Sequence, residues 1–259
     1  MKSYDVIAPF YDVGTGDRSA MAALVRGWIR QRRPGAKRVL ELACGTASML
    51  KPLPQKWEVW GIDLSQAMLQ QARAKVPRGH FLVQDITRFR LPQKFDAIIC
   101  LLDSMNHLTR FRDWEQTFRR VREHLEDGGV FIFDVYTARK LRRLETEGPF
   151  VQMYGRDYLM VSATSGGRGL TNCSIRIFEN VGHGQYRLAE TEIAERAFPL
   201  ARIRRALRKH FPRFRPTERD GEEPRSWRIV FTSSASDATR PAVKLGNPEP
   251  GTRECQPDG

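Results

Sequence analysis

Runs of apolar residues alternate with amphipathic stretches through residues 20–135. Short apolar runs are typical of buried strands, and apolar residues recurring every three or four positions are typical of helices. Five strands are predicted, at Arg38–Leu42, Glu58–Ile62, His80–Gln84, Phe95–Leu101 and Gly129–Asp134. Three helices are predicted, at Ser19–Arg33, Ser65–Lys75 and Arg112–Leu125. This alternation predicts repeated βα units around a parallel sheet.

The helix predicted at 112–125 has the clearest periodicity. Its apolar residues recur at intervals of three and four, in Phe111, Trp114, Phe118, Val121 and Leu125. This spacing puts a single apolar stripe against the sheet. The tripeptide Asp127-Gly128-Gly129 is predicted to end the helix and to turn the chain into the next strand.

From about Gly148 the pattern changes to short β-like runs separated by glycine-rich turns. These runs lie at Arg156–Ala163, Asn172–Asn180 and Tyr186–Ala197. They predict an antiparallel meander inserted into the α/β pattern. A helix at Leu200–His210 and two strands, about Arg213–Arg219 and Trp227–Ser233, are predicted to return the chain to the main sheet.

The predicted fold class is therefore α/β. We expect a Rossmann-like, seven-stranded, mostly parallel sheet with helices on both faces and a small antiparallel β insertion that forms a lid. The core is predicted at 1–147, the lid at 148–197 and the returning part of the core at 198–234. Residues 235–259 are polar, rich in proline and glycine and without periodicity, which predicts a disordered tail.

Composition favours an intracellular globular protein. Of 259 residues, 41% are hydrophobic, which is enough for a buried core. No apolar run approaches the roughly 20 residues of a membrane span. Acidic residues near the start argue against a signal peptide. Four cysteines without C-x-x-C spacing predict reduced thiols in the cytoplasm and no metal site.

The net charge of +13 is the strongest compositional bias. A basic surface can bind nucleic acid, acidic membranes or anionic small molecules. The densest basic block lies at 202–209, on a predicted helix. A solvated helix face is the favoured interpretation of this block, and contact with RNA or another anion is the alternative.

Candidate chemistry begins in the stretch V-L-E-L-A-C-G-T-A at 39–47. An apolar strand carries Glu41 and runs into a loop of small residues centred on Gly45, and the next strand ends in Asp63. Small residues let the backbone approach a ligand, and an acid at a strand end can accept hydrogen bonds from ribose. A nicotinamide site would need G-x-G-x-x-G, whereas this loop has one glycine. The pattern predicts a nucleoside ligand.

Five segments, in order, resemble those of class I S-adenosylmethionine-dependent methyltransferases. E-L-A-C-G-T-A resembles the acid-x-G-x-G-x-G loop, G-I-D-L-S-Q-A-M-L the second-strand motif and F-L-V-Q-D-I the third. P-Q-K-F-D-A-I-I-C-L-L-D-S-M-N-H-L resembles the fourth-strand segment, and H-L-E-D-G-G-V-F-I-F-D the turn into the fifth strand. The resemblance covers roughly residues 1–136, and the ordered series is more specific than any single motif.

The resemblance implies that one group of residues holds the methionine part of S-adenosylmethionine. Glu41 would bind its amino group, Ala43, Gly45 and Ala47 would form the backbone cradle, and Leu101 would line this side. Two glycines of the family loop are alanines here. Alanine costs little at such positions if their φ is negative.

A second group would hold the adenosine part, by the same resemblance. Asp63 would accept the ribose hydroxyls and Leu64 would lie beside the adenine. Asp85 would accept the adenine amino group, and Ile86 would supply a backbone N–H to the ring. S-adenosylhomocysteine would be the product.

Methyl transfer from a sulfonium is an in-line displacement, and a positioned group can accept the proton that an N or O nucleophile loses. Asp103 and His107, just beyond the fourth strand, are candidates, although His107 is also interpretable as structural. Y-D-V-I-A-P-F-Y-D at 4–12 resembles a family segment whose tyrosine folds over the cofactor. Tyr11 is preferred to Tyr4 for this role, and packing against the first helix is the alternative.

The predicted function is methyl transfer to an N or O atom of a small molecule. The charge motivates an RNA or protein methyltransferase as the alternative. Against it, Leu102-Asp103-Ser104-Met105 stands where base-amine methyltransferases have an Asn/Asp-Pro-Pro-aromatic motif. A non-catalytic protein that keeps the cofactor fold is a third possibility, disfavoured because the strand-end acids are present. No membrane partner is expected.

Overall fold

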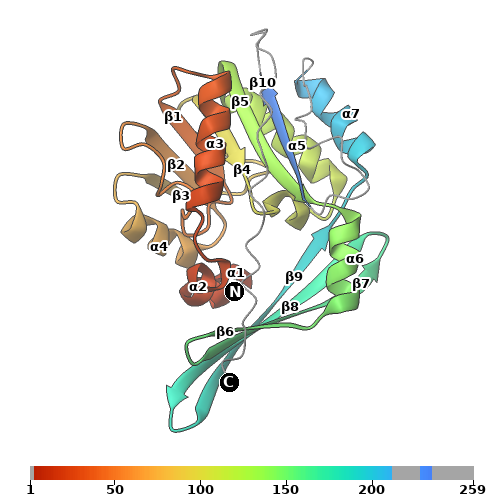
Figure 1. Cartoon of the computed structure of the whole chain (residues 1–259). Helices are drawn as coiled ribbons and strands as arrows, with labels where there is room; N and C mark the ends of the chain where they lie inside the picture. The colour runs from red at the N-terminus through yellow and green to blue at the C-terminus, as the bar shows by residue number, and fades with distance from the viewer. Residues whose placement is uncertain (1–2, 212–227, 235–259) are drawn as a thin grey trace, which may run out of the picture.

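The computed structural model describes residues 3–211 and 228–234, which form two β-sheets with helices (Figure 1). The larger sheet has the strand order β10-β5-β4-β1-β2-β3. Its strands are β1 (Arg38–Leu42), β2 (Glu58–Asp63), β3 (His80–Val83), β4 (Phe95–Cys100), β5 (Leu125–Tyr136) and β10 (Arg228–Ser234). The first five are parallel, and β10 pairs antiparallel with β5. This arrangement confirms the predicted Rossmann-like α/β fold.

Helices cover both faces of this sheet, as predicted. Four are packed on it: α3 (Ser19–Arg32), α4 (Gln66–Lys75), α5 (Phe111–His124) and α7 (Leu200–His210). In β1, Val39 packs with the core that includes α3 and α4, whereas its neighbour Leu40 packs with the core of α5 and α7. Because successive strand residues point to opposite faces, a sheet covered on both sides needs a continuous apolar run. The strand residues of β4 are accordingly all buried.

The apolar stripe predicted on α5 is also confirmed. Phe111, Trp114, Phe118 and Val121 are buried in one core with the sheet residue Phe133. The helix ends at His124, and the glycines expected to terminate it lie in the first residues of β5. There Gly128 has a φ of 75°, a left-handed conformation that favours glycine. The expected turn is therefore an irregularity within a strand.

The predicted antiparallel meander is a second sheet that extends away from the first (Figure 1). Its strands are β6 (Phe150–Tyr154), β7 (Asp157–Gly167), β8 (Leu170–Gly182) and β9 (Gln185–Arg196), paired in this order. Helix α6 (Ala138–Glu147) connects the two sheets. Neither α6 nor β6 was predicted. We call this second sheet the lid.

The N-terminal segment forms three short helices that the sequence did not predict: α1 (Ser3–Ile7), η1 (Ala8–Phe10) and α2 (Tyr11–Thr15). They lie between α4 and the lid (Figure 1). Ile7 and Ala8 pack with Met68 of α4 and with Ile177 of the lid. We call residues 3–15 the N-terminal strap.

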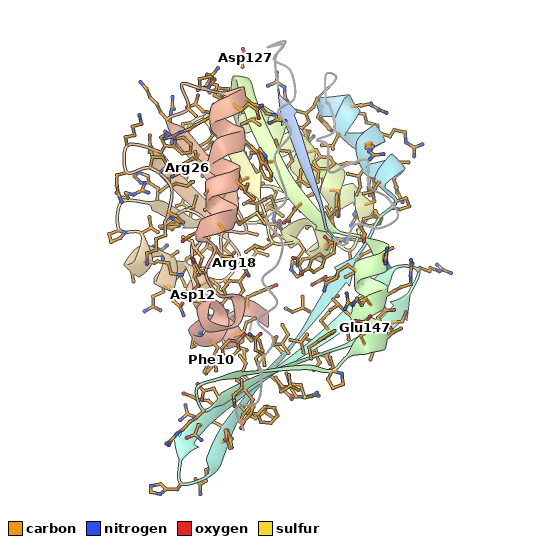
Figure 2. All side chains as sticks on the ribbon, in the orientation of Figure 1. Phe10, Asp12, Arg18, Arg26, Asp127 and Glu147 are labelled. Carbon is orange, nitrogen blue, oxygen red and sulfur yellow. The ribbon has the colours of Figure 1, made fainter. Side chains whose placement is uncertain are left out.

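Polar contacts fasten the strap at both ends. Asp5 accepts hydrogen bonds from the Ser65 hydroxyl and, at 3.4 Å, from the Ala67 N–H. Asp12 accepts hydrogen bonds from Thr46 and Ser48 of the loop after β1, at 2.6 and 2.8 Å, and pairs with Lys75 of α4. Asp12 and Arg18 lie where the strap meets α3, and Asp127 lies at the far end of the larger sheet (Figure 2).

Three expectations need correction or lie beyond the described residues. The described sheet has six strands, five of them parallel, rather than seven, and the strand expected at about 213–219 falls outside the described residues. The tail expected at 235–259 falls outside them as well.

Cys44, Cys100 and Cys173 are buried free thiols. Among the helices in the described part of the chain, none combines the length and apolar composition of a membrane span.

Candidate cofactor and acceptor site

The carboxyl ends of the parallel strands meet at one edge of the sheet, and a cavity of about 560 Å³ opens there. Ligands of open α/β sheets bind at this edge. The strap contributes Tyr4 and Tyr11 to the cavity wall, and the lid contributes Glu192 and Ala194. The walls of the cavity therefore come from three parts of the chain that are distant in sequence.

Most of the predicted site residues line this cavity. They are Ala43, Gly45, Asp63, Leu64, Asp85 and Ile86, with Tyr11 and His107 of the catalytic set. Glu41, Ala47 and Leu101 are buried behind the lining. Leu102 lines the cavity in place of Leu101, whose carbonyl accepts a hydrogen bond of 2.7 Å from the Ser104 hydroxyl.

The loop after β1 has an unusual backbone. Ala43, Gly45 and Ala47 have φ values of 51°, 52° and 60°, all in the left-handed region. Alanine would cost little here if φ were negative, and that condition is not met. A non-glycine residue in this region is destabilised by about 1–2 kcal/mol. The chain thus keeps the backbone geometry of a glycine-rich loop with two alanines in it.

Asp63 connects this loop with the loop after β2. Its Oδ2 accepts a hydrogen bond of 2.9 Å from the Gly45 N–H, and its Oδ1 accepts one of 2.8 Å from the Ser65 N–H. Ser65 in turn caps α4, since its hydroxyl accepts a 3.1 Å hydrogen bond from the Met68 N–H. Each carboxylate oxygen has the capacity for more than one hydrogen bond, which the hydroxyls of a ribose would require.

Contacts within its own turn fix the position of the Asp85 carboxylate. Its Oδ1 accepts hydrogen bonds of 2.8 Å from both the backbone N–H and the hydroxyl of Thr87. Its Oδ2 lies 3.1 Å from Nε of Arg88. These contacts hold the carboxylate at the mouth of the cavity beside Ile86 and Leu64.

Glu41 is the clearest sign of a missing cationic partner. Its side chain is buried, and its Oε2 has no hydrogen-bond partner among the described residues. Burial, and then the charge of Asp63, raise the pKa of Glu41 well above its usual value. A buried carboxyl without a donor is destabilising, and an ammonium group would satisfy it. The residues at this end of the cavity therefore fit the amino group of S-adenosylmethionine.

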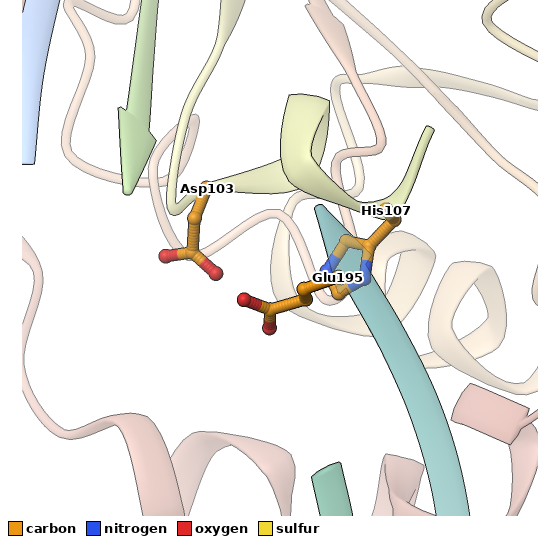
Figure 3. A group of neighbouring side chains, drawn as sticks. All are labelled: Asp103, His107 and Glu195. Carbon is orange, nitrogen blue, oxygen red and sulfur yellow. The ribbon is translucent and has the colours of Figure 1, made fainter. Parts of the chain in front are cut away.

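Three titratable side chains meet at the other end of the site (Figure 3). Asp103 comes from the loop after β4, His107 from η2 (Ser104–His107) and Glu195 from β9 of the lid. One ligand-type atom from each lies within 4.8 Å of the others. Asp103 has a left-handed backbone, and its N–H donates a 2.7 Å hydrogen bond to Asp134. The cluster can bind a cationic group, exchange protons or hold a divalent cation.

His107 contacts Tyr4 of the strap, with Nε2 3.0 Å from the tyrosine oxygen. Burial lowers the pKa of His107 to about 4, so the ring is neutral at pH 7. Burial, followed by nearby negative groups, raises the pKa of Tyr4. Tyr4 and Tyr11 both line the cavity, with ring centroids 6.2 Å apart, so the structure brings both of the tyrosines considered for this role to the site.

Glu195 was missed by the sequence analysis. It lies on a strand of alternating residues, and only 7% of it is exposed. An acid among period-two residues normally faces solvent. The face that Glu195 occupies depends on the strand register, in which Glu195 pairs with Thr171 of β8. The residue's own neighbours in sequence carry no signal of that register.

Comparison with known proteins agrees with this geometry. Residues 39–129 match the family described as "Methyltransferase domain". Over 128 residues the chain is 36% identical to the protein YqeM of Bacillus subtilis (strain 168), an alignment that covers 48% of this chain and 52% of that one.

A second relative is the dTDP-3-amino-3,4,6-trideoxy-α-D-glucopyranose N,N-dimethyltransferase of Streptomyces venezuelae. It is 33% identical over 132 residues, which are 50% of this chain and 55% of that one. The chain spans about half the length of the curated relatives it matches.

Solved structures match over a greater length. A crystal structure of an S-adenosylmethionine-dependent methyltransferase from Clostridium acetobutylicum ATCC 824 has a TM-score of 0.78 and 25% identity, and covers 91% of this chain and 100% of that one. Streptomyces venezuelae DesVI shares the fold, with a TM-score of 0.73 and 22% identity. Residues 39–129 therefore form a methyltransferase domain, and the chain has the class I fold of S-adenosylmethionine-dependent methyltransferases such as the Clostridium acetobutylicum protein.

Proposed function

We propose that this protein transfers the methyl group of S-adenosylmethionine to an N or O atom of a small molecule, preferably to an amine. One observation carries the proposal. A single cavity joins the cofactor loop at Gly45 and Asp63 to His107 of the acidic and imidazole cluster. Its volume of about 560 Å³ lies within the roughly 300–1,000 Å³ typical of small-molecule sites.

The cofactor would lie along the strand ends. Glu41 would pair with its ammonium group, the backbone of 43–47 would surround its methionine part, and Asp63 would accept its ribose hydroxyls. Asp85 and Ile86 would bind the adenine edge. When bound, the sulfonium supplies an activated methyl group, and the protein supplies alignment and exclusion of water.

The transfer is a displacement in which the acceptor's lone pair forms the new bond to the methyl carbon. The carbon–sulfur bond breaks, and its electron pair goes to sulfur to give S-adenosylhomocysteine. A primary or secondary amine becomes a methylated ammonium, which must then lose a proton. Asp103 and Glu195 are the carboxylates next to this position, and they can hold the cation and take its proton.

The carboxylates are also the reason to prefer an amine over a hydroxyl. Two acids beside the neutral His107 create a negative site, which favours a group that becomes cationic on methylation. Relatives named for amino-sugar N,N-dimethylation, at 33% and 30% identity, are in line with this choice.

The alternative of an RNA or protein acceptor rests on the positive charge. Within α7, however, Lys209 pairs with Glu115 at 2.9 Å, and the Arg202 guanidinium lies 4.0 Å from the centre of the Phe111 ring. Part of the basic block is therefore used within the protein. The volume of the cavity favours a small molecule further.

Two experiments test the proposal in sequence. Calorimetric titration with S-adenosylhomocysteine should show binding by the wild type, a loss of at least tenfold in Asp63→Ala and little change in the exposed control Asp17→Ala. The protein is then incubated with methyl-labelled S-adenosylmethionine and either dTDP-activated amino sugars, a small-metabolite extract or bulk RNA. Label in RNA alone would replace the small-molecule proposal with the alternative.

Absence of cofactor binding by the wild type would overturn both forms of the proposal. Cofactor binding with no labelled product in any pool would favour a non-catalytic protein. Reactions with EDTA test whether the cluster of Asp103, His107 and Glu195 holds a divalent cation. Activity that EDTA abolishes and Mg²⁺ or Mn²⁺ restores would assign Asp103, His107 and Glu195 to a metal.

A further inference from the structure

The contact between Tyr4 and His107 has consequences for how an acceptor is held. Tyr4 lies on α1, and His107 lies on η2, more than a hundred residues later. The tyrosine oxygen is 3.0 Å from Nε2 of His107, and the rings are nearly perpendicular, at 85°. Both side chains line the cavity at its acceptor end. The pair therefore presents one polar unit to whatever binds there.

The position of the protons in this unit follows from burial. Tyr4 keeps its hydroxyl proton, because burial and the surrounding acids raise its pKa. His107 is neutral, because burial lowers its pKa to about 4, so its ring has one N–H and one lone pair. The groups that face the pair are Tyr11 from α2, Asp103 from the loop after β4 and Glu195 from β9.

The contact with Tyr4 assigns the tautomer. Nε2 is the nitrogen that meets the Tyr4 oxygen, at 3.0 Å. A phenol is the more acidic donor and an imidazole nitrogen the more basic acceptor, so the Tyr4 hydroxyl donates its proton to a lone pair at Nε2. The one N–H of the neutral ring is then at Nδ1, which is buried without a hydrogen-bond partner among the described residues.

This arrangement changes the role expected for His107. Its basic nitrogen already accepts the Tyr4 hydroxyl proton, so it does not face the acceptor as an open base. The tyrosine oxygen has two acceptor lone pairs in addition to its donated proton. It lies in the cavity wall, where an acceptor must enter.

Building on the proposed function, we propose that the Tyr4 oxygen accepts a hydrogen bond from the N–H or O–H of the methyl acceptor. His107 is then a positioning residue, because it fixes the direction of the Tyr4 hydroxyl. The acceptor's own lone pair is thereby directed at the methyl group. A misplacement of about 1 Å can lower such a reaction by about 10²-fold, so a single orienting contact is sufficient to matter.

The first test needs no acceptor. The full chain is labelled with nitrogen-15 in histidine, and long-range proton–nitrogen NMR spectra identify the tautomer of each ring. The signals that disappear in the spectrum of His107→Gln are assigned to His107 among the five histidines. We expect the Nδ1–H tautomer of His107 from about pH 8 to about pH 5. In Tyr4→Phe the His107 signals should move, while those of the exposed-tyrosine control Tyr186→Phe should not.

The second test separates an acceptor contact from a cofactor contact. In Tyr4→Phe, affinity for S-adenosylhomocysteine should stay within about threefold of wild type. Its kcat/KM for dTDP-3-amino-3,6-dideoxy-α-D-glucopyranose, used as the probe acceptor, should fall by at least about tenfold. His107→Leu should show the same loss, and Tyr4→Phe/His107→Leu should be no worse than either single variant. His107→Gln should recover much of the activity, because its amide oxygen can accept the Tyr4 hydroxyl.

Several results would overturn the inference. An Nε2–H tautomer in the wild type, or unchanged His107 signals in Tyr4→Phe, would refute the hydrogen-bond arrangement. Additive losses in the double variant would refute the action of His107 through Tyr4. A tenfold loss of S-adenosylhomocysteine affinity with unchanged transfer would make Tyr4 a cofactor contact. Failure of the proposed function is separate, since it shows in the wild type as no cofactor binding or no labelled product.

Discussion

The left-handed loop after β1 allows a quantitative test by exchange of glycine and alanine. Ala43, Gly45 and Ala47 share nearly the same φ, but their surroundings differ. Ala43 is partly buried in the cavity wall, whereas Ala47 is fully buried in the core below α3 and α4. We therefore expect the three exchanges to have different effects on the free energy of unfolding.

The magnitudes follow from opposing effects. Replacing alanine by glycine removes about 1–2 kcal/mol of left-handed strain. It also adds about 0.5–1 kcal/mol of conformational entropy to the unfolded chain. Ala43→Gly should therefore stabilise the protein by about 0.5 kcal/mol. Ala47→Gly also loses a buried methyl group, worth about 0.8 kcal/mol, so it should be neutral or slightly destabilising.

Gly45→Ala is the reverse exchange. A Cβ at this position would lie 3.6 Å from Cε1 of Tyr11, which is an ordinary van der Waals contact. The left-handed strain of about 1–2 kcal/mol should exceed the roughly 0.5–1 kcal/mol gained because alanine restricts the unfolded chain, so the net destabilisation should be about 0.5 kcal/mol or slightly more. A clash with Tyr11 is not expected to add to it.

The assay is urea unfolding followed by circular dichroism, with thermal unfolding as a second measurement. For a chain of this length, 1 kcal/mol corresponds to a shift of about 2–4 °C in Tm. The expected order of stability is Ala43→Gly, wild type, Ala47→Gly, Gly45→Ala. If Ala43→Gly were less stable than Ala47→Gly, or if Gly45→Ala matched the wild type, the loop would not have the backbone described above.

Three further predictions concern titratable and charged groups of the site and the strap. Binding of S-adenosylhomocysteine should release up to one proton, since pairing with its ammonium ionises the buried Glu41. Calorimetry in buffers of different ionisation enthalpy should detect this release in the wild type and lose it in Glu41→Gln. His107 has its pKa lowered from 6.5 to about 4, so its contribution to stability is present above pH 6.5 and lost as the pH falls towards 4. Between pH 7 and pH 4 the free energy of unfolding of the wild type should fall by up to about 3 kcal/mol more than that of His107→Gln. Equal decreases in the two proteins would contradict this prediction. Asp12→Asn should leave Lys75 without its carboxylate partner and loosen the strap. Stopped-flow experiments should then show S-adenosylhomocysteine dissociating several-fold faster than from the wild type, whereas the control Asp17→Asn should not differ. Equal dissociation rates in Asp12→Asn and the wild type would mean that the strap does not hold the cofactor.

The parts of the fold that were predicted well are those in which burial follows a regular pattern. β1 and β4 are buried on both faces, so their sequences are continuous apolar runs. α5 buries one side only, so its stripe recurs at helical spacing.

The elements that were missed bury little. In α6, Leu141 is the buried residue, and the residues of β6 are mostly exposed. Such segments carry no hydrophobic periodicity for a sequence analysis to detect. The strap helices are too short to be stable alone, and Asp5, Gln71 and Asp12 hold them through contacts with distant residues.

By itself, the sequence determined the parallel sheet and the strand-end residues at Glu41, Asp63 and Asp85. It did so because a strand end and the residue that follows it are neighbours in the chain. The tertiary structure alone decided that Tyr4 and Glu195 join His107, because the strap and the lid reach the cavity from distant parts of the described chain. It also decided the left-handed φ of Ala43 and Ala47, which goes against the local preference of alanine, in a loop whose Cys44 and Gly45 N–H groups donate hydrogen bonds to Ile62 and Asp63.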